Sequence, residues 1–136
     1  MSLHHQSLVA RQRADDLFIK LHQLSLQEFP SFEKLELGSQ LRRAAYSVTV
    51  NIVESFSHRD QSDRLNYLNV AEASLAEVEH CVQMAGRLGY IKKEMVDDLE
   101  GQIKSVSAPL SGLIRSARLF PSAQVADESR RIQPLR

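Results

Sequence analysis

Apolar residues recur at alternating steps of three and four through most of this chain, and that spacing constrains the fold more than any other feature. Steps of three and four return to one side of an α-helix, whereas a half-buried β-strand needs steps of two. The pattern is interrupted at Pro30, at Gly38, in the polar run 57–63, at Gly89 and at Pro121. These interruptions divide the chain into four long segments and predict four helices.

Three of the segments show one apolar stripe each, the pattern of a helix with one buried side. They cover about residues 7–29, 62–88 and 92–119. In order, the three stripes consist of Ala10, Ala14, Leu17, Leu21, Leu24 and Glu28; Leu68, Ala71, Leu75, Val78, Val82 and Ala85; and Met95, Leu99, Ile103, Val106, Leu110, Leu113 and Ala117.

The ends of these segments carry helix boundary signals. Pro30 disfavours helical backbone at the residue before it and ends the first helix. Ser62 is predicted as the N-cap of the third helix, and Gly89 follows its last turn. Pro109 lies inside the fourth segment, where it should free the Ser105 carbonyl and bend the helix.

The remaining segment, about residues 38–57, has no charged side chain between Arg43 and Glu54. One stripe is Leu41, Ala45, Val48 and Ile52, and Tyr46, Val50, Val53 and Phe56 fill other sides. A helix that is apolar nearly all round should be buried nearly all round, but a helix in a bundle normally keeps one face in water. The segment therefore predicts cover from another copy of the chain. A β-strand at residues 46–53 is the alternative, and it would have no strand to pair with.

The length of 136 residues fits a single domain. Matched segment lengths and short connections predict an all-α, antiparallel up-down four-helix bundle over residues 1–120. The pattern ends after Leu119, so residues 121–136, with Arg130, Arg131 and Arg136, are predicted to form a flexible tail.

Charge and cysteine content narrow the class of protein. The net charge is zero, so no overall field draws the chain to nucleic acid or anionic lipid. The one cysteine, Cys81, cannot form an intrachain disulfide and suits a reducing compartment. No run of eighteen apolar residues is present. These features predict a cytoplasmic protein without a membrane segment.

Four runs of sequence carry a resemblance to a known family. Residues 37–45 (LGSQLRRAA) and 47–55 (SVTVNIVES) resemble the second helix of the bacterial four-helix-bundle proteins named for intervening sequences in large-subunit ribosomal RNA genes. Residues 67–79 (YLNVAEASLAEVE) are similar to the third helix of that family, and 88–91 (LGYI) to its turn into the fourth. The resemblance spans about residues 14–119.

The resemblance implies a closed homopentameric ring of four-helix bundles, and it establishes no biochemical activity for ordinary members. The family includes the accessory variability determinant of diversity-generating retroelements, a basic protein that works with a reverse transcriptase and nucleic acid. The neutral charge of this chain argues against that subgroup. The chain also departs from the family pattern at Gly38, Ser55 and Pro109.

Few residue patterns suggest catalysis or metal binding. Glu77 and His80 have the spacing that di-iron bundles use, but such sites need the motif twice and two further inward carboxylates. A solvated helix face is the favoured interpretation. Cys81 and His80 are adjacent, so on a helix they point in different directions and cannot act as a nucleophile and its base. We therefore expect no enzyme activity, no cofactor and no small-molecule substrate.

The candidate residues for the family motif and for assembly are Gln40, Arg42, Arg43, Asn51, Glu54 and Glu77. Asn51 lies on the most apolar helix, where it either bonds water or sets the register of a helix contact; the resemblance favours the second. Arg42 and Arg43 either contact phosphate or form ion pairs with Glu33, Glu36 or a neighbouring chain, and the ion pair is favoured.

The leading functional hypothesis is a non-enzymatic, homo-oligomeric scaffold or interaction ring. The alternative is an RNA- or DNA-binding accessory subunit, for example of a reverse-transcriptase system. Arg42, Arg43 and the tail arginines have no acid directly beside them, whereas Lys34 adjoins Glu33 and Lys93 adjoins Glu94. For this reason we expect only weak and unspecific nucleic-acid binding.

Overall fold

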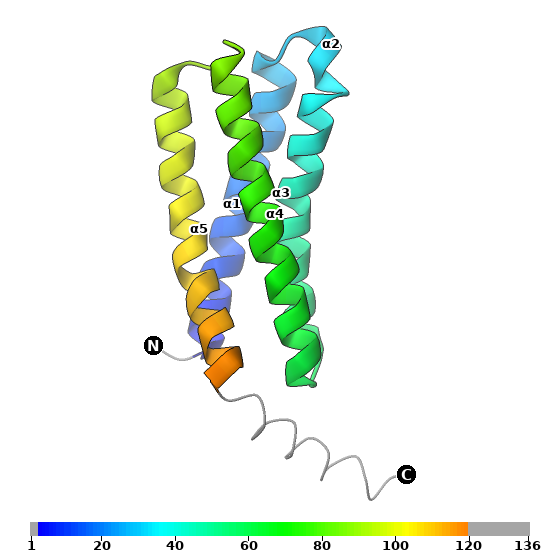
Figure 1. Ribbon diagram of the computed structural model, residues 1–136, viewed down its shortest axis with the longest axis vertical. Helices are drawn as coiled ribbons and strands as arrows, with labels where there is room; N and C mark the ends of the chain where they lie inside the picture. The colour runs from blue at the N-terminus through cyan, green and yellow to red at the C-terminus, as the bar shows by residue number, and fades with distance from the viewer. Residues whose placement is uncertain (1–2, 120–136) are drawn as a thin grey trace, which may run out of the picture.

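The computed structural model describes residues 3–119 and contains four long helices with one short helix between the first two (Figure 1). The helices are α1 (Leu3–Glu28), α2 (Ser31–Lys34), α3 (Leu37–Ser57), α4 (Gln61–Arg87) and α5 (Lys93–Leu119). No strand occurs within these residues, and the segment 46–53 lies inside α3. The all-helical prediction is confirmed, and the strand alternative for 46–53 is wrong. The predicted tail, residues 121–136, lies outside the described residues.

The four long helices form an up-down bundle in which α1 lies beside α3 and α5, and α4 lies beside the same two helices (Figure 1). Polar contacts fix the antiparallel register of α1 and α5. Arg13 reaches the Ser105 carbonyl, and seven residues further along α1, Lys20 pairs with Asp98. The four-helix bundle expected from the stripes is therefore present.

The apolar stripes meet in one continuous core. All six stripe residues of the third predicted segment are buried, as are Leu99, Ile103, Val106, Leu110, Leu113 and Ala117 of the fourth. One assignment on α1 is wrong, because Glu28 is exposed and Ser25 is buried instead. Ser25 is tolerated in the core since its hydroxyl donates to the His22 carbonyl, at 3.1 Å.

The ends of α4 show how local sequence sets its limits. Asp60, not Ser62, is the N-cap, because the Asp60 carboxylate accepts a hydrogen bond from the Ser62 backbone N–H at 2.9 Å. At the other end Gly89 has φ 79°, and the Tyr90 and Gly89 N–H groups donate to the carbonyls of Ala85 and Gly86. This is a Schellman turn, which needs a left-handed residue at Gly89.

Pro109 lies inside α5, as the sequence predicts. Proline has no N–H, so the Ser105 carbonyl lacks its usual helical donor. The Arg13 guanidinium on α1 donates to that carbonyl at 2.9 Å. A contact between helices thus replaces the hydrogen bond that the proline removes.

Candidate functional site

Arg42 joins three elements at the end of the bundle that holds α2. Its Nη1 donates to the Ser25 hydroxyl on α1 at 2.8 Å, and its Nη2 donates to the Lys34 carbonyl of α2 at 2.8 Å. Both acceptors are neutral oxygens. The predicted ion pair with Glu33 or Glu36 is therefore wrong, although the structural role that it implied is present.

Gly38 gives the Arg42 guanidinium room to lie there. A Cβ atom added at Gly38 would lie 2.9 Å from Arg42 Nη1 and 3.1 Å from the Glu33 carbonyl oxygen. A larger residue at this position would therefore displace the guanidinium. This close approach accounts for glycine at one of the three positions where the chain departs from the family pattern.

The other family-motif candidates do not gather around Arg42. Arg43 is exposed and donates one long hydrogen bond, 3.3 Å, to the Ser39 hydroxyl. Gln40 and Glu77 are also exposed, on α3 and α4. Glu54 is half-buried near the end of α3, where its backbone carbonyl contacts His58 Nδ1 at 2.9 Å. These residues form no single site.

Asn51 belongs to a small polar network between α3 and α4. Its Nδ2 donates to the Ser47 carbonyl at 2.8 Å and contacts the Ser47 hydroxyl at 3.1 Å. That hydroxyl in turn bonds the Ser74 hydroxyl of α4 at 2.7 Å. Asn51 thus orients the Ser47 hydroxyl, which forms a hydrogen bond to α4. Through this bond Asn51 can influence the register of α3 and α4.

The potential nucleophile Cys81 is buried. Burial raises the pKa of the Cys81 thiol, and the nearby Glu77 carboxylate raises it further. Both effects keep the thiol protonated and unreactive at neutral pH. Residues 3–119 contain no group of three or more His, Cys, Asp and Glu side chains placed to hold a metal ion.

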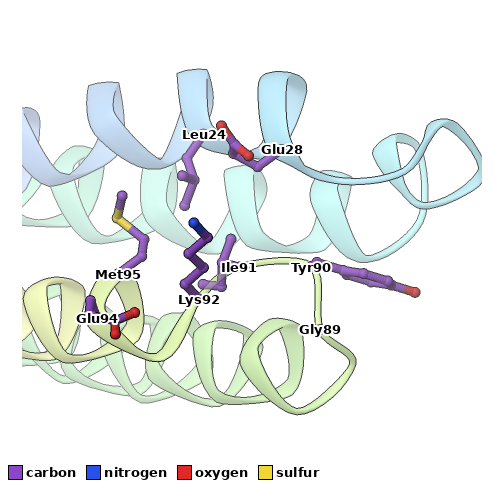
Figure 2. A pocket seen from close by; sticks show the side chains of 8 residues that line it. All are labelled: Leu24, Glu28, Gly89, Tyr90, Ile91, Lys92, Glu94 and Met95. Atoms are coloured by element: carbon purple, nitrogen blue, oxygen red, sulfur yellow. The ribbon is translucent and has the colours of Figure 1, made fainter.

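A groove of about 680 Å³ lies where the α4–α5 turn meets the end of α1 (Figure 2). Lys92 extends from the turn toward Leu24 and Glu28 of α1, while the Tyr90 ring points away from the groove. The Tyr90 hydroxyl donates to the Glu33 carboxylate at 2.6 Å, a hydrogen bond that raises the pKa of Tyr90. No serine, cysteine or histidine lines the groove, so it holds neither a hydroxyl–imidazole pair with serine nor a thiol–imidazole pair.

Apolar side chains remain exposed on the outer side of α1 and α3. We define the α1–α3 face as Leu8, Ile19, Leu26, Tyr46, Val50, Val53 and Phe56. Ile19 and Tyr46 are 53% and 55% exposed, and Val50 and Val53 are half-buried. The sequence predicted that α3 carries more apolar surface than one chain covers. In residues 3–119 these apolar side chains of α3 are indeed only partly covered.

Sequence reasoning missed two kinds of residue. Arg13 gave no local signal, because its acceptor at Ser105 is far away in the chain. Arg115 and Arg118 were overlooked, although neither has an acid beside it in the sequence. A check of every lysine and arginine for adjacent acids would have included Arg115 and Arg118 among the candidates.

Comparison with known proteins gives a family and a fold. The model of the family described as 23S rRNA-intervening sequence protein matches residues 6–112, which include all six candidate residues. The chain is also similar to the crystal structure of a protein of unknown function from the S23 ribosomal protein family of Bacteroides thetaiotaomicron. The TM-score is 0.76 at 19% identity, covering 81% of this chain and 98% of the other. No curated protein matches significantly.

Proposed function

We propose that this chain, which belongs to the family of 23S rRNA-intervening sequence proteins, is the non-enzymatic subunit of a cytoplasmic homo-oligomeric ring. The ring is a pentamer, as the family resemblance implies, and it acts as a scaffold that presents repeated surfaces to a partner. The α1–α3 face of each copy packs against a different face of its neighbour, because a closed ring of five is built from head-to-tail contacts.

The observation that carries this proposal is the apolar character of the α1–α3 face. On α1, residues 8, 19 and 26 are separated by eleven and seven positions, intervals that return to one side of a helix. Tyr46 and Val53 extend this surface onto α3, and the Tyr46 ring packs against Phe18 of α1 at 5.6 Å between centroids. A cluster of exposed apolar side chains on a small domain is typical of a protein interface.

The free energy available from covering this face is sufficient for association. Burying the exposed half of a side chain such as Ile19 or Tyr46 contributes about 1 kcal/mol. Each of the seven side chains of the face adds to this total, and the apolar part of the opposing surface on the neighbour adds its own contribution. Association is therefore favoured, provided that the opposing surface is complementary.

The test is the mass in solution. Light scattering should give about 77 kDa for five chains of 15.4 kDa. Replacing Ile19 and Tyr46 together with glutamate should shift the mass toward 15.4 kDa, because two charges would have to be buried. Leu35→Glu is the control, since Leu35 is 82% exposed and lies outside the face. A wild-type monomer would refute the ring, and a double variant of unchanged mass would refute the choice of face.

The alternative function, nucleic-acid binding through Arg42 and Arg43, receives less support. Both amino groups of the Arg42 guanidinium donate to protein oxygens, so phosphate would compete with two existing hydrogen bonds. Arg43 remains exposed, but a single arginine binds phosphate weakly. Arg42 is therefore better explained as a structural residue.

A further inference from the structure

The net charge of zero conceals an uneven distribution along the bundle. One end contains residues 3–13, 47–71 and 109–119, where α1 and α4 begin and α3 and α5 end (Figure 1). We call it the basic end, because it holds six arginines and only three carboxylates. The arginines are Arg11, Arg13, Arg59, Arg64, Arg115 and Arg118, and the carboxylates are Glu54, Asp60 and Asp63.

The three carboxylates of the basic end offset only half the charge of its six arginines and leave an excess of three positive charges. Asp60 accepts the capping hydrogen bond of α4, and Glu54 is half-buried on α3. The two ion pairs within residues 3–119, Lys20 with Asp98 and Lys93 with Asp97, both lie toward the opposite end. None of the arginines in the basic end forms an ion pair with another described residue.

Four arginines of the basic end have their guanidinium groups available. They are exposed, and no hydrogen bond or ion pair to another described residue holds them: Arg11, Arg59, Arg115 and Arg118. By contrast, the Arg64 Nε donates to the His58 carbonyl at 2.6 Å, and Arg13 donates to the Ser105 carbonyl. The held arginines keep their charge and still contribute to the local potential.

We propose that the basic end binds the phosphate backbone of single-stranded nucleic acid without sequence selectivity. A guanidinium matches the oxygens of a phosphodiester through two parallel hydrogen bonds, and it stays charged at any pH that the protein meets. Arg59 lies in the α3–α4 turn, Arg118 lies in the last turn of α5, and Arg115 precedes Arg118 by three residues on the same helix. Exposed cations from separate elements can follow a backbone that passes across the end of the bundle.

An anionic membrane fits this surface less well. Peripheral proteins usually insert the apolar face of a helix that lies flat in the interface. Here the helices present their ends, and their apolar stripes are buried in the core. If the protein forms the proposed ring with its bundles parallel, all basic ends face the same side of the ring. One strand could then contact several of them at once. Only this gain from several contacts depends on the proposed ring.

The test compares two variants that remove the same charge from opposite ends. Arg115→Gln with Arg118→Gln changes the basic end, and Lys92→Gln with Lys93→Gln changes the α4–α5 turn at the other. A short fluorescein-labelled RNA of mixed sequence is titrated by anisotropy at increasing salt. We expect the arginine variant to lose affinity on the order of tenfold at low salt, with a salt slope shallower by about 1.4, the value for two single-strand contacts. The lysine variant should stay within about twofold.

Each other result contradicts the proposal. Equal losses in both variants would mean that net charge alone matters, and equal affinity to wild type in both would mean that the basic end is not used. Binding to phosphatidylserine vesicles without binding to RNA would identify a membrane surface instead. If the arginine variant does not fold by circular dichroism, Arg59→Gln replaces it with an expected severalfold loss. Light scattering on the same samples keeps the two proposals separate, because the ring proposal fails if the wild-type protein is a monomer, whatever its affinity for RNA.

Discussion

Replacing Arg42 with methionine should destabilise the bundle far more than the same change at Arg43. Methionine preserves the aliphatic length of the side chain and removes the guanidinium. At position 42 the change removes two hydrogen bonds of 2.8 Å that connect α3 to Ser25 on α1 and to the Lys34 carbonyl of α2. At position 43 it removes one bond of 3.3 Å to a serine on the same helix.

The magnitude follows from the two bonds and their surroundings. A hydrogen bond that involves a charged group contributes about 1.5 to 3 kcal/mol to stability. Arg42 is half-buried, so the lower part of that range applies to each bond. Ser25 is fully buried but keeps its own bond to the His22 carbonyl, so its hydroxyl is not left without a partner. We therefore expect Arg42→Met to lower the free energy of unfolding by about 3 kcal/mol.

The assay is urea denaturation followed by circular dichroism, at one protein concentration for all variants because an oligomer's stability depends on concentration. Arg43→Met should stay within about 0.5 kcal/mol of wild type, as exposed substitutions usually do. Arg42→Lys should fall between the two, because an ammonium lacks the planar fork that reaches two acceptors. Equal costs for Arg42→Met and Arg43→Met would refute the reasoning.

Three further changes have expected outcomes. Asn51→Leu should alter helix register or oligomer mass more than helix content, because leucine cannot orient Ser47; unchanged mass and melting would make Asn51 an ordinary surface residue. Arg13→Met should lower the free energy of unfolding, measured in urea, by about 1 kcal/mol. In a Pro109→Ala background the loss should be smaller, because the alanine N–H can bond the Ser105 carbonyl. An equal loss in both backgrounds would exclude this coupling. Gly89→Ala should lower the free energy of unfolding by about 1 kcal/mol. The loss comes from backbone strain alone, since no atom lies within 4 Å of the added Cβ. An unchanged stability would mean that the turn changes its backbone conformation.

The helices were predictable because each depends on neighbours in the sequence. A stripe at steps of three and four buries one side of a helix wherever the partner lies, and Gly89 ends α4 through its own backbone freedom. Errors occurred where two residues offered the same local chemistry. Asp60 and Ser62 are both good caps, and only the tertiary course of the α3–α4 turn selects Asp60.

The partners of polar residues were much less predictable. Arg42 was expected to pair with Glu33 or Glu36 because those acids are near in sequence, yet it binds a hydroxyl and a carbonyl. Backbone carbonyls are present at every residue, so their availability cannot be read from the residue types. Arg13 illustrates the same limit, since its acceptor is a carbonyl that becomes free only because Pro109 lies one turn later on another helix.

Net charge is a poor summary for an elongated bundle, and for this reason the net charge of zero gives no indication of the basic end. Charges at opposite ends of a helix of 27 residues are about 40 Å apart, several Debye lengths at physiological salt. A partner at one end therefore meets the local excess of arginine and is hardly affected by carboxylates at the other. In an up-down bundle, segments distant in sequence, such as 3–13, 58–64 and 115–118, meet at one end. A charge count made over the ends of the predicted helices, once the antiparallel order is known, would have shown the asymmetry.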